Sequence, residues 1–198
     1  MTTHNGIFGS GSNFDDRFIP DYANLRVRTE ACKAIDCKVV LTSGSFDILH
    51  QDHCAYLEAA GKLGGILVVG VDSDAKIKKR KGPDRPIVPE LERVRMLTYL
   101  RSVSMVTLKD VGHERWALIK AVRPDILVAT KATYTPEEIE ELKTLCGEIV
   151  VLEPMGSSST TARIRLLLMN FKDRVAEEIG ILLDRLVHGD GSRPQEGR

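Results

Sequence analysis

Short, continuous apolar runs alternate along the middle of the chain with longer segments in which apolar residues recur every three or four positions. The runs are rich in valine, isoleucine and leucine and predict strands buried on both faces of a sheet, at residues 37–41, 66–71, 105–108, 126–129 and 149–152. The periodic segments predict helices at residues 23–35, 53–63, 91–103, 114–122, 136–146 and 160–168. Alternating strands and helices indicate an α/β fold with a parallel sheet of about five strands.

The predicted domain is a Rossmann-like, doubly wound sheet with helices on both faces, and it spans residues 23–168. The polar residues 1–22 predict a flexible tail, and residues 189–198 predict a disordered one. Residues 169–188 predict a C-terminal helical extension with a narrow apolar stripe, formed by Phe171, Val175, Ile179, Leu182 and Leu186. The stripe suits packing on the chain's own body or pairing with a second subunit, and because of the second alternative we expect a homodimer.

The composition narrows the class of protein. The 198 residues include 28 basic and 28 acidic side chains, and zero net charge argues against a protein that coats nucleic acid. The longest apolar stretch, residues 66–71, is far shorter than a membrane-spanning helix of about 20 residues. The four cysteines form no CxxC pair and residues 1–16 contain no apolar signal segment. We therefore expect a cytoplasmic protein with no nucleic-acid and no membrane partner.

Candidate chemistry lies directly after the first predicted strand, from Gly44 to His53. A junction of strand, glycine turn and helix directs backbone N–H groups and a helix N-terminus toward one point, which favours an anion. His50 and His53 are three residues apart at the start of that helix, so both imidazoles could donate to one phosphate oxygen. Taken singly, a histidine near a helix start is more often a cap or a packed ring, and the HxxH spacing alone could be a metal pair.

The same segment resembles the signature Gly-x-Phe-Asp-x-x-His-x-Gly-His of the cytidylyltransferase-like nucleotidyltransferases. The matching positions are Gly44, Phe46, Asp47, His50 and His53. Further segments resemble the family's second-strand ending, its Lys-Gly-Pro-x-Arg-Pro loop, its Pro-Leu-Glu-x-Arg helix start and its Ser-Thr-Thr motif, at residues 71–74, 81–86, 89–93 and 159–161. The resemblance covers residues 39–164 and is strongest to the branch of heptose-1-phosphate adenylyltransferases and glycerol-3-phosphate cytidylyltransferases.

The resemblance implies transfer of a nucleoside monophosphate from ATP or CTP, with ATP favoured, to a phosphorylated sugar or polyol, with release of pyrophosphate. The acceptor phosphate would attack the α-phosphorus directly, so catalysis would consist of positioning and charge stabilisation. The implied catalytic residues are His50, His53 and Lys81. The implied nucleotide-binding residues are Gly44, Ser45, Phe46, Asp47, Arg93, Ser159, Thr160 and Thr161. Asp72, Arg85 and Lys131 would bind the acceptor, and Mg²⁺ would bridge phosphates without a site made by protein side chains alone.

The distribution of charge agrees with a triphosphate site. Residues 76–101 contain nine basic side chains and three acidic ones, a local excess in a chain of zero net charge. A solvated charged face is the alternative for residues 76–80.

Two departures from the family pattern leave a second function open. Asp52 stands where the signature has glycine. Residues 129–134 stand where the family has Lys-Gly-Gly-Asp-Tyr, and they contain no acidic residue. They favour, as an alternative, a catalytically silent nucleotide-binding protein that serves as a sensor or assembly partner. A dinucleotide-binding oxidoreductase is excluded because no GxGxxG motif follows the first strand.

Overall fold

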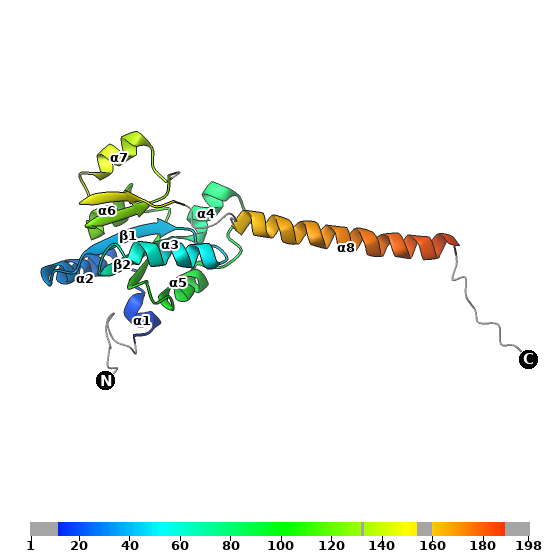
Figure 1. Ribbon diagram of the computed structural model, residues 1–198, viewed down its shortest axis with the longest axis horizontal. Coiled ribbons are helices and arrows are strands. Elements are labelled where there is room, and N and C mark those ends of the chain that lie inside the picture. Colours follow the sequence, from blue (N-terminus) through cyan, green and yellow to red (C-terminus); the bar gives the residue numbers. More distant parts are fainter. Residues whose placement is uncertain (1–11, 132, 154–159, 189–198) are drawn as a thin grey trace, which may run out of the picture. The chain divides into compact units, whose positions relative to one another are not determined.

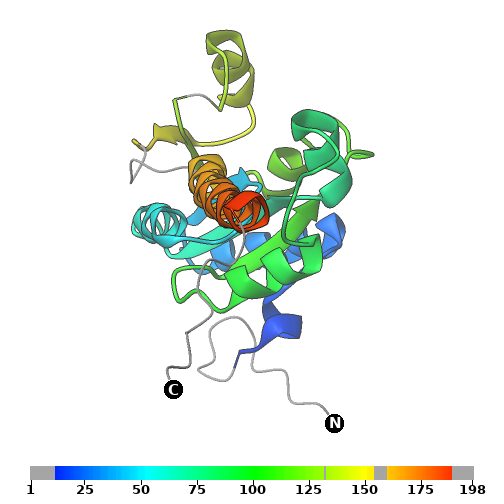
Figure 2. The ribbon, with the colours of Figure 1, turned by 90° about the vertical axis from the view of Figure 1, so that its right-hand side faces the viewer.

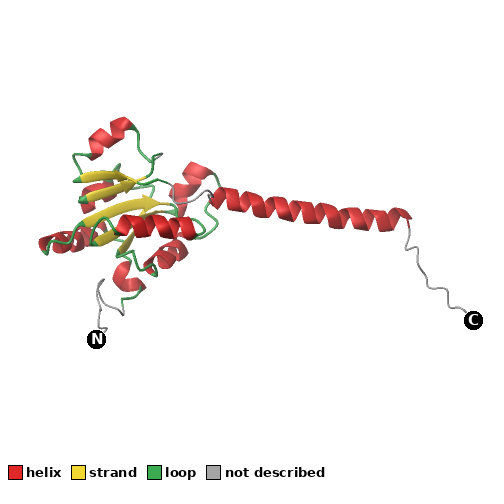
Figure 3. Ribbon diagram, in the orientation of Figure 1, coloured by secondary structure: helices red, strands yellow, loops and turns green. Residues whose placement is uncertain are grey.

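The computed structural model describes residues 12–131, 133–153 and 160–188 (Figure 1). Its centre is a five-stranded, entirely parallel sheet in the order β3-β2-β1-β4-β5 (Figure 3). The strands are β1 (Val39–Gly44), β2 (Ile66–Asp72), β3 (Met105–Lys109), β4 (Ile126–Ala129) and β5 (Glu148–Val151). The predicted α/β class and parallel sheet are therefore confirmed.

Helices lie on both faces of the sheet (Figure 2). Side chains of successive strand residues enter two separate apolar layers, one on each face. Val39 and Leu41 pack with α2 (Tyr22–Ala34) and α6 (Ala117–Val122), whereas Val40 packs with α3 (Gln51–Gly61) and α5 (Glu90–Thr98). This alternation follows from the two-residue period of a strand. It explains why the strand segments are apolar at nearly every position.

The strand order creates a switch point beside β1. From β1 the chain proceeds outward to β2 and β3, and it then crosses to the other side of β1 to form β4 and β5. In doubly wound sheets the loops that leave the strands at such a point diverge, and ligands bind in the resulting crevice at the carboxyl ends. The candidate loop after β1 therefore begins at the topologically expected place.

The part of the predicted tail that is described is ordered against the sheet. Residues 12–22 contain the short helix α1 (Phe14–Arg17), and Phe18 forms a parallel bridge with Val106 of β3. Arg17 Nη1 donates to the carbonyls of Thr98 and Val103 at 3.0 and 3.1 Å. These long-range contacts, which local polarity does not reveal, explain the difference from the predicted flexible segment.

Two further helices differ from the sequence prediction. The helix α4 (Asp74–Lys81) was not predicted, because its only apolar residues are Ala75 and the buried Ile77. The helix α8 (Thr160–His188) is continuous, so the predicted boundary between residues 168 and 169 falls inside it. The chain instead divides into compact units of residues 1–157 and 158–198.

α7 (Pro136–Leu142) completes the set of helices in the described ranges. None of these helices is long and apolar enough to cross a membrane.

Gly70 in β2 leaves space that a side chain would fill. A Cβ there would lie 2.3 Å from Leu118 Cδ2 and 2.9 Å from Lys109 Cδ. We expect Gly70→Ala to lower the free energy of unfolding by about 1–3 kcal/mol, because the buried neighbours must move. Gly112→Ala is the control, since a Cβ there meets nothing within 4 Å. Urea denaturation of both variants measures the difference, and equal stabilities would contradict this packing.

Candidate functional site

The loop between β1 and α3 has an unusual backbone. Phe46 and Ile48 have φ angles of +47° and +46°, in the left-handed region that costs a non-glycine residue about 1–2 kcal/mol. The Phe46 ring is buried in the α3–α5 layer, 3.2 Å from where a Cβ on Gly44 would lie. Burial of this ring anchors the strained loop, and Gly44 leaves room for it. Strain of this kind is concentrated at functional sites.

Asp47 fastens this loop to the segment before α5. Its Oδ1 accepts hydrogen bonds from the backbone N–H groups of Ile87 and Val88, both at 3.0 Å, and its Oδ2 accepts one from Arg85 Nη1 at 2.7 Å. Burial raises the pKa of Asp47, but the hydrogen bonds and the Arg85 charge outweigh it, so the net pKa is lowered from 3.8. Asp47 and Arg85, predicted to contact nucleotide and acceptor, are paired with each other in the structure.

Arg93 is buried and joins several segments. Its Nε donates to the carbonyl of Val88 at 2.9 Å, its Nη1 donates to the carbonyl of Ser45, and its Nη2 pairs with Asp74 Oδ1 at 2.7 Å. The side chain is only 1% exposed. This packing differs from the predicted direct contact with phosphate and gives Arg93 a positioning role.

The two histidines lie together at the start of α3. Their rings are stacked, with centroids 3.9 Å apart, and the edge of Phe46 supports His53 at 5.5 Å. His50 is the N-cap residue of α3 but makes no side-chain capping bond, so the N–H groups of the first turn stay available to a ligand. The structure thus brings together the imidazole pair and the helix N-terminus that the sequence predicts, an arrangement suited to phosphate.

Asp52 lies beside this pair. Its Oδ2 is 3.7 Å from His50 Nδ1, and neither atom makes a hydrogen bond within the described part of the chain. The carboxylate that replaces the signature glycine therefore faces the His50 ring across a gap slightly longer than a hydrogen bond.

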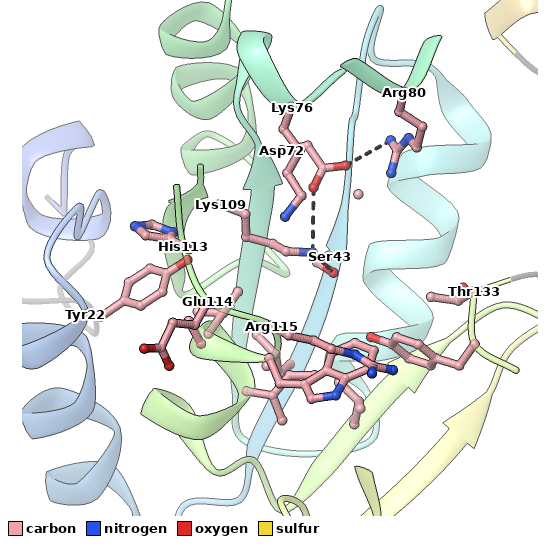
Figure 4. Close-up of a pocket in the computed structure, with 18 residues that line it drawn as sticks. Tyr22, Ser43, Asp72, Lys76, Arg80, Lys109, His113, Glu114, Arg115 and Thr133 are labelled. Carbon is pink, nitrogen blue, oxygen red and sulfur yellow. Dashed lines mark hydrogen bonds and ion pairs between the residues drawn. The ribbon is translucent and has the colours of Figure 1, made fainter. Parts of the chain in front are cut away.

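A cavity of about 570 Å³ lies at the carboxyl ends of β1, β2 and β3 (Figure 4). At one end of it the nearly buried Asp72 pairs through Oδ2 with Arg80 Nη2 at 2.9 Å, and its Oδ1 lies 3.6 Å from Lys109 Nζ. Lys109 also donates to Ser43 Oγ at 3.0 Å. Burial lowers the pKa of Lys109, and the charge of Asp72 opposes that shift.

Arg80 connects this cavity to the loop before α3. The same Nη2 that pairs with Asp72 donates to Ser45 Oγ at 2.7 Å. The cavity and the histidine-bearing loop therefore share a cationic side chain.

The other end of the cavity is aromatic. Trp116 and Tyr134 meet edge to face with ring centroids 5.5 Å apart, and Leu118 and Leu127 belong to the same lining. Burial raises the pKa of Tyr134 to about 12, so its hydroxyl stays protonated at neutral pH. The cavity thus joins a charged end to an apolar one, as ligand sites commonly do.

Several predicted residues lie outside the cavity lining or outside the described residues. Lys131 is exposed and pairs with Glu153 at 2.6 Å, whereas the neighbouring Thr133 lines the cavity. Lys81 ends α4 with a largely exposed side chain; partial desolvation of its ammonium and the charges of Arg80 and Arg85 lower its pKa. Ser159 and the side chains of residues 160 and 161 lie outside what the structure describes.

Sequence reasoning missed Lys109, Arg80 and Trp116. Two signals point to Lys109: it follows an apolar run at the carboxyl end of a strand, and Gly70 interrupts the neighbouring strand. Arg80 is one of four consecutive basic residues, so the sequence does not distinguish it from its neighbours. The backbone of Trp116 is left-handed, with φ of 62°, and no local sequence signal predicts it.

The hydrogen bonds and ion pair of the Asp47 carboxylate predict that the stability of the fold depends on pH. We expect Asp47→Asn to lower the free energy of unfolding at pH 7 by about 1–3 kcal/mol, because buried donors lose an ionised acceptor. The native carboxylate stabilises the fold above its ordinary pKa of 3.8, and that contribution is lost as the pH falls through the lowered folded-state value. The difference between the two proteins should therefore narrow below about pH 4.

Thermal or urea denaturation at several pH values measures this narrowing. Asp84→Asn, which changes an exposed carboxylate in the adjoining segment, is the control. A loss of unfolding free energy in Asp47→Asn that does not change with pH would argue against an ionised Asp47 carboxylate in the folded protein.

The chain is similar to a known protein family and to several known proteins. The model of the cytidylyltransferase-like family matches residues 41–179. The chain is 37% identical over 149 residues to the bifunctional protein HldE of a Nitratiruptor species, and 44% identical over 146 residues to that of Citrobacter koseri. The alignments cover 74% and 72% of this chain but 31% and 30% of those relatives, so the chain spans under a third of their length.

Two solved structures have the same architecture. The lipopolysaccharide core biosynthesis protein from Thermoplasma volcanium GSS1 has a TM-score of 0.51 and 28% identity, covering 62% of this chain and 99% of that one. The pantoate-beta-alanine ligase from Francisella tularensis has a TM-score of 0.52 at 10% identity, covering 73% of this chain and 68% of that one, which is a likeness of fold alone. The family model covers most of the chain and includes the stacked histidines and the loop that carries them, so this chain belongs to the cytidylyltransferase-like family.

Proposed function

We propose that this chain is a nucleotidyltransferase that transfers a nucleoside monophosphate from ATP, or less favourably CTP, to a phosphorylated sugar or polyol. The observation that carries the proposal is the stacked pair of His50 and His53 at the uncapped N-terminus of α3. Two imidazoles lie there beside the N–H groups of the first helical turn, which suits the phosphates of a nucleoside triphosphate.

The reaction requires no protein nucleophile. An oxygen of the acceptor phosphate forms a bond to the α-phosphorus, while the bond from that phosphorus to the bridging oxygen breaks and releases pyrophosphate. The histidine pair would stabilise negative charge on the triphosphate and on the leaving pyrophosphate. Lys81 would neutralise charge near the α-phosphorus. Asp47 and Arg93 act as positioning residues, since their contacts hold the loop that presents the histidines.

The acceptor would occupy the cavity that begins at Asp72. Arg80 supports this assignment because it contacts both Asp72 in the cavity and Ser45 in the loop between β1 and α3. The two substrates would then meet across this side chain, as direct transfer requires. The hydroxyls of the Ser-Thr-Thr motif at residues 159–161 are proposed to bind the pyrophosphate.

Adenylyl transfer is favoured as the specific form. The segment at residues 81–86 resembles the loop of heptose-phosphate adenylyltransferases, and the matching relatives are named HldE. Lys131, in the segment that replaces Lys-Gly-Gly-Asp-Tyr, lies outside the cavity lining and pairs with Glu153.

Magnesium is the proposed cofactor. The described residues contain no group of three or more His, Cys, Asp or Glu side chains that could hold a metal ion. The Asp52 carboxylate fits a single protein ligand, because its buried Oδ2 makes no hydrogen bond within that part of the chain. Asp52 would hold the ion together with phosphate oxygens, and the bound ion would neutralise phosphate charge.

The alternative function is nucleotide binding without catalysis. Asp52 favours it, since a carboxylate 3.7 Å from His50 Nδ1 would repel a triphosphate in the absence of a cation. The retained histidine pair and the cavity beside it favour the enzyme.

The histidines can be tested by pyrophosphate release. With Mg²⁺, each nucleoside triphosphate and a panel of sugar and polyol phosphates, one pair should give release. His50→Ala and His53→Ala should each slow it by about 100-fold or more, since each removes a donor to developing charge. Gln51→Ala, an exposed residue of the same helical turn, should leave the rate unchanged. No release from any pair, with nucleotide binding retained, would support the silent binding protein instead.

We propose a homodimer from the apolar pattern along α8 alone. Its apolar residues at positions 171, 175, 179, 182 and 186 have the spacing of four and three residues that forms a helix–helix seam. We expect the double substitution Ile179→Glu and Leu182→Glu to halve the mass measured by light scattering, because it places charges in the seam. Glu177→Lys, on the opposite side of the helix, should leave the mass unchanged. A native protein that is already monomeric would rule out this role.

A further inference from the structure

We propose that Lys109 is a catalytic residue that binds the reacting phosphate of the acceptor, and that the site selects a phosphate monoester dianion. This inference rests on the proposed function, which assigns the acceptor to the cavity but names no residue that holds its phosphate.

The route of the Lys109 side chain is built into the sheet. Lys109 ends β3, yet its ammonium lies beside Ser43 of β1 and Asp72 of β2. It crosses β2 where Gly70 has no side chain, because a Cβ at that position would lie 2.9 Å from Lys109 Cδ. A glycine inside a central strand weakens the strand, and here it leaves space that Leu118 and the Lys109 side chain both use.

The inner end of the cavity has a charge of plus two. Lys76, Arg80 and Lys109 line it together with one carboxylate, Asp72. A phosphate monoester near neutral pH carries close to two negative charges, so the ligand would balance this end of the cavity.

The outer charges do not alter that balance. Arg115 pairs with Glu138 and Glu141 at 3.2 and 3.3 Å, and it is largely exposed. Glu114 and His113 are exposed at the rim beside Tyr22 (Figure 4). These groups are accessible to water, which screens their charges more strongly than those of Asp72 and Lys109, whose side chains are 3% and 26% exposed.

The ammonium of Lys109 has a donor left for a ligand. A lysine has three N–H donors; one goes to Ser43 Oγ, and Asp72 Oδ1 at 3.6 Å engages a second at most. Figure 4 shows the ammonium between these two groups at the edge of the cavity. Burial, which lowers the pKa of this lysine, also strengthens a hydrogen bond to a phosphate oxygen.

The protein contains its own reporter for this site. Trp116 is the only tryptophan in the chain, and it lines the cavity. Tryptophan fluorescence of the full chain can therefore be titrated with inorganic phosphate, glycerol 3-phosphate and glucose 1-phosphate, without nucleotide and without turnover.

We expect these phosphates to change the fluorescence of the native protein. Lys109→Met should raise the Kd for each by about tenfold or more, since a charge-assisted hydrogen bond is lost. Lys120→Met makes the same substitution at an exposed position outside the cavity and should leave the Kd unchanged. Thermal denaturation of both variants separates loss of binding from loss of fold, and Lys109→Arg, which retains the charge, should recover part of the affinity.

His53→Ala distinguishes this proposal from the proposed function. Phosphate affinity that depends on Lys109 and persists in His53→Ala supports an acceptor site, even if no nucleotide is ever transferred. Phosphate binding that is unaffected by Lys109→Met in a folded protein would overturn the proposal. A fluorescence response to nucleoside triphosphates that is absent for all three phosphates would also overturn it, because the cavity would then hold the nucleotide.

Discussion

A buried guanidinium connects the segments on which the site depends. Arg93 donates to carbonyls in two different loops and to a carboxylate at the start of α4. Its planar fork supplies several donors in a fixed geometry, which suits it to hold three segments at once. Loss of this side chain would leave buried acceptors without partners, at a cost larger than that of a surface contact. Asp47 adds a second link between the same two loops.

The strained loop after β1 is tolerated because of these links. Two residues with positive φ would be unfavourable in an isolated peptide, but the buried Phe46 ring and the paired Asp47 hold them in place. The backbone carries His50 into the N-cap position and aligns it with His53 one turn later. Packing energy from the domain core thereby holds two largely buried imidazoles beside a helix N-terminus.

The cavity depends on a different buried charge. Asp72 lies between Arg80 and Lys109, whose positive charges would otherwise repel each other at low dielectric. Because Arg80 also contacts Ser45, the charge balance of the cavity is coupled to the loop that carries the histidines.

The sequence predicted the histidine-bearing loop of the candidate site better than the cavity beside it. Gly44 to His53 are consecutive, so their spacing along the chain already indicates which groups converge. Ser43, Asp72 and Lys109 come from three strands, and their proximity follows from the order β3-β2-β1, which periodicity does not specify. Lys131 shows the same limit: its sequence position suggested a ligand contact, but in the fold it pairs with Glu153.

The sequence by itself determined the α/β class, the positions of the strands and the histidine-bearing junction, because these depend on local periodicity and on residues close together in the chain. Only the tertiary structure decided that Arg93 and Asp47 hold loops together and that Lys109 reaches the cavity. Those roles depend on which groups burial leaves without water as a partner, and they are fixed by contacts between residues 40 to 66 positions apart.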